Sequence, residues 1–113
     1  MRTDGQWYWA EYSTFSISDE VGKYQLTVDG YSGDAGDAMA ASAQGLWNSN
    51  GKEFSTPDSD NDDAAGYWCA ADHNVGWWYR WCSAAAINND DLGLWSTVAV
   101  VDVQSSRMMI KVD

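Results

Sequence analysis

Residues 54–83, FSTPDSDNDDAAGYWCAADHNVGWWYRWCS, contain both cysteines of the chain, its densest acidic run, half of its tryptophans and its only histidine. The two cysteines, Cys69 and Cys82, are too far apart for a CxxC metal or redox motif. A disulfide between them would close a loop of about 15 residues and add on the order of 3 kcal/mol of stability by restricting the unfolded chain. Such a bond favours an oxidising compartment, and the alternative is a pair of buried free thiols in a cytosolic protein.

The acidic run supplies the oxygen donors that a hard cation needs. Four carboxylates and one amide lie close together, and they are Asp58, Asp60, Asn61, Asp62 and Asp63. Calcium binds roughly 6–8 oxygens from carboxylates, carbonyls and water. An EF-hand is excluded, because counting from Asp58 places Asp63 at the glycine position and Cys69 at the position of the bidentate glutamate. Two interpretations remain, another kind of calcium loop and a solvated acidic turn.

Length and charge limit the classes of function. A chain of 113 residues is one domain with a real core, and its formal charge of −11 disfavours binding to nucleic acid and to anionic membranes. Cations and basic or neutral ligands are compatible with that charge. The chain has no apolar run of membrane-spanning length, and its start, MRTDGQWYW, lacks the apolar region of a signal peptide. No Asn-x-Ser/Thr sequon occurs, so N-glycosylation is not expected.

The hydrophobic spacing predicts short strands separated by long loops. Alternation of apolar and polar residues predicts a half-buried strand at Tyr24, Leu26 and Val28, and residues 30–51 are predicted to be mainly loop. The remaining expected elements are an early strand in residues 7–17, a turn or two of helix in 38–44, a buried strand in 98–103 and a closing strand in 108–112. The predicted fold class is α+β with little helix, in which a metal and a disulfide hold the loops.

Several motifs in fixed order resemble the C-terminal part of the fibrinogen-like domain. They are YQLTVDGYSGDAGDAM at residues 24–39, NGKEFST at 50–56, the acidic DSDND, CA followed by GWWY and a second cysteine, and the ending RMMIKV at 107–112. The resemblance implies a single partial fibrinogen-like domain over residues 1–113, with short antiparallel strands and without the N-terminal subdomain of the family. It also implies a Cys69–Cys82 disulfide.

The resemblance further implies a calcium site in the acidic loop. Asp60 and Asp62 would supply side-chain oxygens to one Ca²⁺, backbone carbonyls near Ala64 and Gly66 with water would complete the shell, and Asp58 would be an outer partner. These residues are therefore the expected metal site.

A ligand pocket between the two cysteines is also implied, lined by Asp72, His73, Tyr79, Trp81 and Ser83. In the family the peptide bond before the second cysteine is cis, which corresponds here to Trp81–Cys82, whereas Trp77 and Trp78 are expected in the core. The chain departs from the family in two places. Ser83 stands where a histidine is typical, and NNDDLG at residues 88–93 replaces NGxYxxG and a longer loop, with Asp91 near an expected tyrosine. We therefore expect weak ligand binding, in the millimolar range.

The predicted function is a calcium-stabilised, lectin-like recognition module of a secreted, extracellular protein. Its partners would be glycans, acetylated small ligands or an extracellular protein, in innate defence or adhesion, and the parent protein would be a homo-oligomer through regions outside this chain. The alternative is a structural fragment of the domain that has lost its ligand. Catalysis is not expected, because no G-x-S-x-G elbow accompanies Ser83, His73 and the aspartates.

Overall fold

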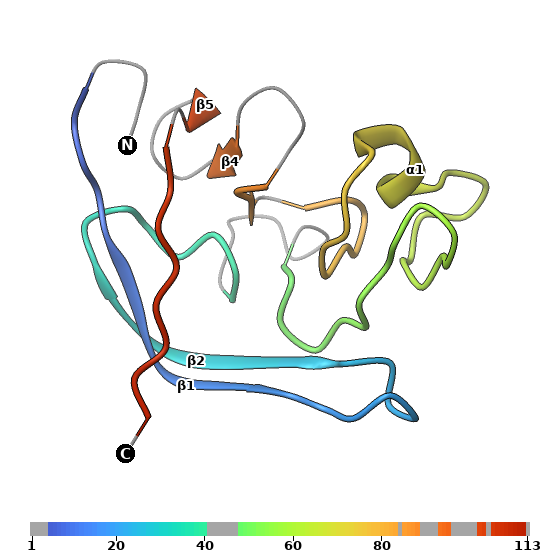
Figure 1. Cartoon of the computed structure of the whole chain (residues 1–113), viewed down its shortest axis with the longest axis horizontal. Coiled ribbons are helices and arrows are strands. Elements are labelled where there is room, and N and C mark those ends of the chain that lie inside the picture. Colours follow the sequence, from blue (N-terminus) through green and yellow to red (C-terminus); the bar gives the residue numbers. More distant parts are fainter. Residues whose placement is uncertain are drawn as a thin grey trace.

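The computed structural model describes residues 5–40, 48–83, 85–88, 93–95, 102–103 and 105–112. In chain order the elements are β1 (Ala10–Ile17), β2 (Leu26–Gly33), α1 (Cys69–His73), β3 (Ala85–Ala86), β4 (Gly93–Trp95) and β5 (Asp102–Val103). β1 and β2 form one antiparallel ribbon, and β3, β4 and β5 form a second antiparallel sheet in that order. The described residues thus confirm the α+β class, with short strands, one short helix and long loops (Figure 1).

The β1–β2 ribbon is amphipathic, as the alternation in residues 24–28 predicts. Leu26 and Val28 are buried, while Thr27 and Asp29 between them are exposed. Their partners across the ribbon are Ile17 and Phe15, which share their face because directly paired residues of an antiparallel sheet point the same way. β2 begins two residues later than expected and continues to Gly33, into a stretch expected to be loop.

Gly30 allows the two strands to approach closely. Its φ of +72° lies in the left-handed region, and a Cβ atom at this position would overlap the side chain of Ser13 on β1. Only glycine satisfies both conditions without strain. The ribbon continues past this point, and Tyr12 meets Tyr31 with ring centroids 5.7 Å apart.

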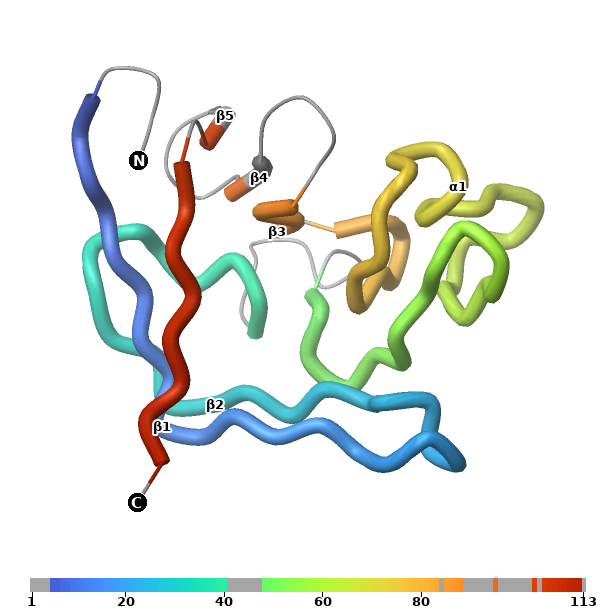
Figure 2. The backbone as a smooth tube through the Cα atoms, in the orientation of Figure 1, coloured from blue at the N-terminus to red at the C-terminus, as the bar shows by residue number. Residues whose placement is uncertain are grey.

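The core lies between the ribbon and the cysteine-bearing segment, which Figure 2 places across the molecule from each other. Trp77 and Trp78 are buried and meet edge to face with centroids 5.2 Å apart, which confirms their predicted place in the core. Their indole N–H groups donate to Ser49 Oγ (3.2 Å) and to the Tyr24 carbonyl (2.9 Å). The paired tryptophans therefore tie the segment before Cys82 to the ribbon.

Several sequence predictions need correction. Residues 107–112 form no strand, and Met108, Met109, Ile110 and Val112 are exposed, because no described strand pairs with them. The helix α1 and the strands β3 and β4 were not predicted. Of the buried strand expected in 98–103, only β5 is described. Of the helical turn expected in 38–44, residues 38–40 form a turn, and residues 41–44 lie outside the described residues.

Candidate functional site

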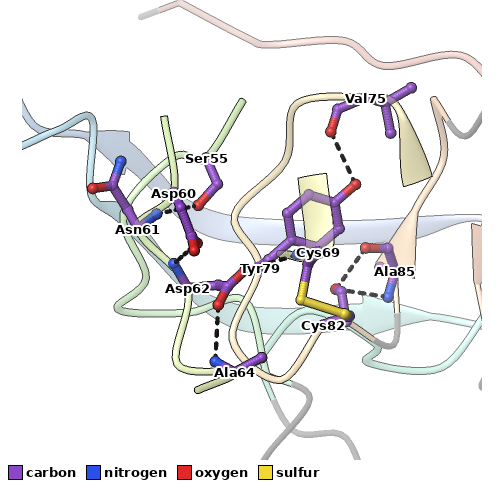
Figure 3. Close-up of a disulfide and its surroundings, with 11 residues drawn as sticks. Ser55, Asp60, Asn61, Asp62, Ala64, Cys69, Val75, Tyr79, Cys82 and Ala85 are labelled. Carbon is purple, nitrogen blue, oxygen red and sulfur yellow. Dashed lines mark hydrogen bonds between the residues drawn. A yellow bond between two sulfur atoms is a disulfide. The ribbon is translucent and has the colours of Figure 1, made fainter. Parts of the chain in front are cut away.

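The predicted disulfide is present and fixes the start of helix α1. Cys69, the first residue of α1, is joined to Cys82 with their Cα atoms 5.4 Å apart, and Cys69 is fully buried (Figure 3). The helix ends at Asn74, which adopts a left-handed conformation (φ 58°) that asparagine tolerates well. All of the expected ligand residues except Ser83 lie between the two cysteines. The disulfide thus holds together the two ends of this region.

The peptide bond between Trp81 and Cys82 is trans, contrary to the cis bond implied by the resemblance; no peptide bond in the described segments is cis. The chain instead turns through Trp81 with a hydrogen bond from Arg80 N to the Cys82 carbonyl (2.7 Å). Before a residue other than proline, the trans form is favoured by about 2.5–4 kcal/mol. The backbone around Trp81 therefore presents a different shape from the one expected.

The acidic residues of the loop differ in their partners. Asp63 forms ion pairs with Lys52 (2.6 Å) and Arg80 (3.5 Å). Asp58 accepts a hydrogen bond from the hydroxyl of Thr56 (2.6 Å). Both carboxylates are thus occupied by neighbours of the protein itself. Asp60 and Asp62 have no ion pair within the described residues.

Asp62 lies at the centre of the loop. Its two carboxylate oxygens accept hydrogen bonds from Ala64 N (2.8 Å) and Cys69 N (2.9 Å), and Asp62 N donates to Asp60 Oδ1 (3.2 Å; Figure 3). Burial raises the pKa of Asp62, and the hydrogen bond with Asp60 and its nearby negative charge raise it further, although the two backbone donors act in the opposite direction. Two carboxylates are therefore held together without a basic side chain to neutralise them.

The donors available near this pair suit a hard cation. Ala64 is buried and its carbonyl accepts a hydrogen bond from Tyr67 N (3.0 Å), which closes a turn over Gly66 (φ +76°). Among the residues that the structure describes, no group of three or more His, Cys, Asp or Glu side chains is placed to hold a metal. A cation here would need backbone carbonyls and water besides the Asp60 and Asp62 carboxylates, which are the donor types that calcium accepts.

An exposed aromatic surface follows the acidic loop directly. Tyr67 stacks on Trp81 with centroids 6.0 Å apart and an interplanar angle of 17°. Trp68 beside them is 39% exposed, and its indole N–H donates to the Thr56 carbonyl (3.2 Å). Tyr67 and Trp68 were not predicted as site residues; their adjacency to Cys69 and Gly66 was the available signal.

Asp72 contacts this surface, and His73 follows it as the last residue of α1. Asp72 is exposed on α1, and its hydrogen bond with the Tyr67 hydroxyl is the main cause that raises the pKa of Tyr67. His73 is half-buried and stacks on Tyr79 with centroids 5.7 Å apart. Tyr67, Trp68, Asp72, His73 and Trp81 together form what we call the aromatic face.

Tyr79 is buried and Ser83 is half-buried, and their expected place in a ligand pocket stays a prediction. Tyr79 is 1% exposed, its hydroxyl donates to the Val75 carbonyl (3.1 Å), and burial raises its pKa to about 12. The Ser83 hydroxyl donates to the Ala85 carbonyl (2.6 Å) and accepts from Ala85 N (3.1 Å). Both side chains are used internally. Asp91 lies outside the described residues.

No helix in the described part of the chain is long and apolar enough to span a bilayer.

Residues 1–102 match the family model of the fibrinogen beta and gamma chains, C-terminal globular domain. Angiopoietin-related protein 6 of Mus musculus is 40% identical over 86 residues, covering 76% of this chain and 16% of the relative. A techylectin-like protein of Phoneutria nigriventer is 37% identical over 84 residues, covering 74% of this chain and 35% of the relative.

Solved structures agree with the sequence relatives. The fibrinogen-like globe domain of human ANGPTL6 matches with a TM-score of 0.67 and 34% identity, over 77% of this chain and 36% of that one. Lamprey fibrin D-dimer, complexed with the peptide ligand Gly-His-Arg-Pro-amide, matches with a TM-score of 0.69 and 31% identity, over 75% of this chain and 29% of that one. The chain therefore covers at most 36% of the length of any of these proteins.

Proposed function

Because this chain belongs to the family of fibrinogen C-terminal globular domains, we propose that it is a calcium-stabilised, lectin-like recognition module of a secreted protein. The observation that carries the proposal is the stacking of Tyr67 on Trp81, which places an exposed aromatic surface immediately after the acidic loop. Flat aromatic faces can contact the apolar faces of sugars and acetyl groups. The role is one of binding and not of catalysis.

Calcium would be held by the carboxylates of Asp60 and Asp62, with the backbone carbonyls of Ala64 and Gly66 and with water. Support comes from the ion pairs of the loop, since Lys52 and Arg80 neutralise Asp63, whereas Asp60 and Asp62 have no ion pair within the described residues. A bound divalent cation supplies positive charge that removes the repulsion between Asp60 and Asp62.

The metal would affect the ligand surface through the backbone. Gly66, Tyr67 and Trp68 connect the acidic loop to Cys69, and Asp62 accepts a hydrogen bond from Cys69 N (2.9 Å). A cation that orders this loop would therefore also fix the position of Tyr67 against Trp81. Calcium would act without touching the ligand, so chelation should weaken binding.

The ligand we propose is a glycan or an acetylated group that is neutral or positively charged. The aromatic face carries the carboxylate of Asp72, and the whole chain has a charge of −11, so anionic sugars are disfavoured. The name of the techylectin-like relative is consistent with a lectin role, and the lamprey relative binds a small peptide. The internal use of Tyr79 and Ser83 leaves a shallow surface, for which we expect a Kd in the millimolar range, roughly −4 kcal/mol.

Titration with N-acetylglucosamine, followed by NMR, tests this function. We expect resonances of His73, Tyr67 and Trp81 to shift in the presence of calcium, and the shifts to weaken after chelation. Trp81→Ala should abolish them, whereas Trp9→Ala, which removes a tryptophan of similar exposure from the other end of the described chain, should not.

Shifts that are unchanged by both chelation and Trp81→Ala would contradict the lectin-like role. Absence of any shift up to tens of millimolar ligand would favour the second candidate, a structural part of a fibrinogen-like domain without a ligand. The internal hydrogen bonds of Ser83 and Tyr79 are the observations that favour this candidate.

Secretion is part of the proposal and is supported by the disulfide. Disulfides persist in oxidising compartments and are rare in the cytosol. The Cys69–Cys82 bond joins α1 to the segment that carries Trp81, so the aromatic face depends on it.

A further inference from the structure

A small hollow lies at the turn between β1 and β2, and it shares no residue with the aromatic face. It has a volume of about 250 Å³ and is lined by Glu20, Lys23, Tyr24, Phe54, Thr56, Ser59 and Asn61. This volume is below the roughly 300–1,000 Å³ of pockets that hold drug-sized molecules. The hollow, here called the turn pocket, is therefore of a size to hold one side chain or a comparably small group.

The backbone of the turn pocket is strained at two successive residues. Lys23 and Tyr24 have φ values of 57° and 55°, in the left-handed region that side chains other than Asn, Asp and Gly rarely adopt. Asn74 has the same conformation at the end of α1, but asparagine tolerates it. Glycine would satisfy the turn more easily at both positions. Strain of this kind persists only where the surrounding structure enforces it, and it is found often at functional sites.

Long-range hydrogen bonds hold the strained residues in place. The Lys23 carbonyl accepts from Phe54 N (2.9 Å), and the Tyr24 carbonyl accepts from the indole N–H of Trp78 (2.9 Å). Tyr24 N also donates to the Asp19 carbonyl (3.0 Å). The backbone at the rim of the turn pocket is thus fixed to the core, in the same place with or without a ligand.

Three polar groups of the pocket offer an acceptor without a partner in the described residues. Neither the Glu20 carboxylate nor the Tyr24 hydroxyl bonds any group in the described residues. Asn61 uses its amide N–H₂ on the Phe54 carbonyl (2.8 Å), which leaves its Oδ1 as an acceptor. The rings of Tyr24 and Phe54 add apolar surface, with Tyr24 43% exposed.

The charges around the pocket are predominantly negative. Glu20 lines it, and three further carboxylates belong to or contact its lining segments: Asp19, Glu53 and Asp58. The single ammonium, that of Lys23, lies 3.7 Å from Glu53. The turn pocket combines an aromatic wall with hydrogen-bond acceptors and a carboxylate that has no basic partner among the described residues. A flat, positively charged group with several hydrogen-bond donors is complementary to such a lining.

We propose that the turn pocket binds the guanidinium group of an arginine side chain on a basic peptide or protein partner. The guanidinium would donate to the Glu20 carboxylate and to Asn61 Oδ1 and would stack on the ring of Tyr24. This site shares no residue with the aromatic face, and its Asn61 lies between the proposed calcium ligands Asp60 and Asp62.

The test is an NMR titration of the whole chain with Nα-acetyl-arginine amide, with the neutral isostere Nα-acetyl-citrulline amide as the matched probe. We expect saturable shifts at Tyr24 and Phe54 with arginine only, both with calcium and after chelation. Glu20→Gln should weaken binding about tenfold, since it removes a charge-assisted hydrogen bond. Asp29→Asn, which removes an exposed carboxylate of β2 outside the pocket, should change the affinity less than twofold.

Two glycine variants separate binding from strain. Lys23→Gly and Tyr24→Gly should each raise Tm or leave it unchanged, because both relieve a left-handed conformation. Tyr24→Gly should abolish arginine binding, whereas Lys23→Gly should preserve or strengthen it. The proposal would be overturned if the citrulline probe binds as tightly as the arginine probe, or if the Glu20→Gln or Tyr24→Gly variant binds arginine as tightly as the unchanged chain. Shifts confined to His73 and Trp81 would overturn it as well. Shifts at the turn pocket with N-acetylglucosamine in place of arginine would also overturn it.

Discussion

At the scale of single residues, carboxylates of one short run differ because their neighbours differ. Asp63 is neutralised by Lys52 and Arg80, and Asp58 is satisfied by a hydroxyl. Asp62 is partly buried and lies next to Asp60 without a basic partner. The acidic pattern marks the loop in the sequence, but only the folded chain shows which carboxylates have a basic partner.

Asp62 gives a prediction about pH. Because its pKa is raised in the folded chain, its contribution to stability is full below the ordinary value of 3.8 and is lost as the pH rises through the raised value. In chelator, NMR of the Asp62 carboxyl carbon should show a midpoint above 3.8, and saturating calcium should lower that midpoint. A midpoint at or below 3.8 in the chelated protein would show that the loop has no need of a cation.

At the scale of elements, the β1–β2 ribbon depends on one glycine. Gly30→Ala should lower the free energy of unfolding by about 1–3 kcal/mol for the left-handed backbone alone, and further because the new methyl overlaps Ser13. Gly5→Ala is the matched control, since Gly5 has a φ of +84° but no atom within 4 Å of an added Cβ. Urea denaturation measures both variants. Equal losses would mean that the approach of Ser13 does not constrain the ribbon.

Elements with strong local patterns could be predicted, and elements made by distant contacts could not. The alternation at Leu26 and Val28 is local, and the cysteine count and family motifs sufficed for the disulfide. Helix α1 has five residues and no side-chain cap, so no periodicity could show it. β3 has two residues, defined only by pairing with Trp95 and Leu94. The apolar alternation at 108–112 was misleading because a strand also needs a partner.

The same limit applies to the candidate site. Asp60 and Asp62 could be identified from their motif, and their role in binding calcium stays a prediction. Tyr67 was missed because its ring meets that of Trp81 only in the folded chain, where the disulfide brings the segments before Cys69 and Cys82 together. Tyr79 was expected at the surface because aromatic character alone does not distinguish a buried ring from an exposed one.

At the scale of the whole molecule, two surfaces of different chemistry lie on one acidic chain. The aromatic face adjoins the acidic loop, and the turn pocket lies at the end of the ribbon. With a formal charge of −11, the chain should attract cations over its surface, so the calcium experiments need physiological salt to separate a specific site from general screening.

Above all, we propose that calcium in the acidic loop orders the aromatic face. Calcium titration, followed by the indole N–H resonances of the tryptophans, measures this most directly. We predict saturation at one equivalent, with shifts at Trp68 and Trp81 but not at the exposed Trp7 and Trp9, and loss of the response in the double variant Asp60→Asn, Asp62→Asn. No saturable shift at Trp68 and Trp81, or an undiminished response in the double variant, would contradict the account.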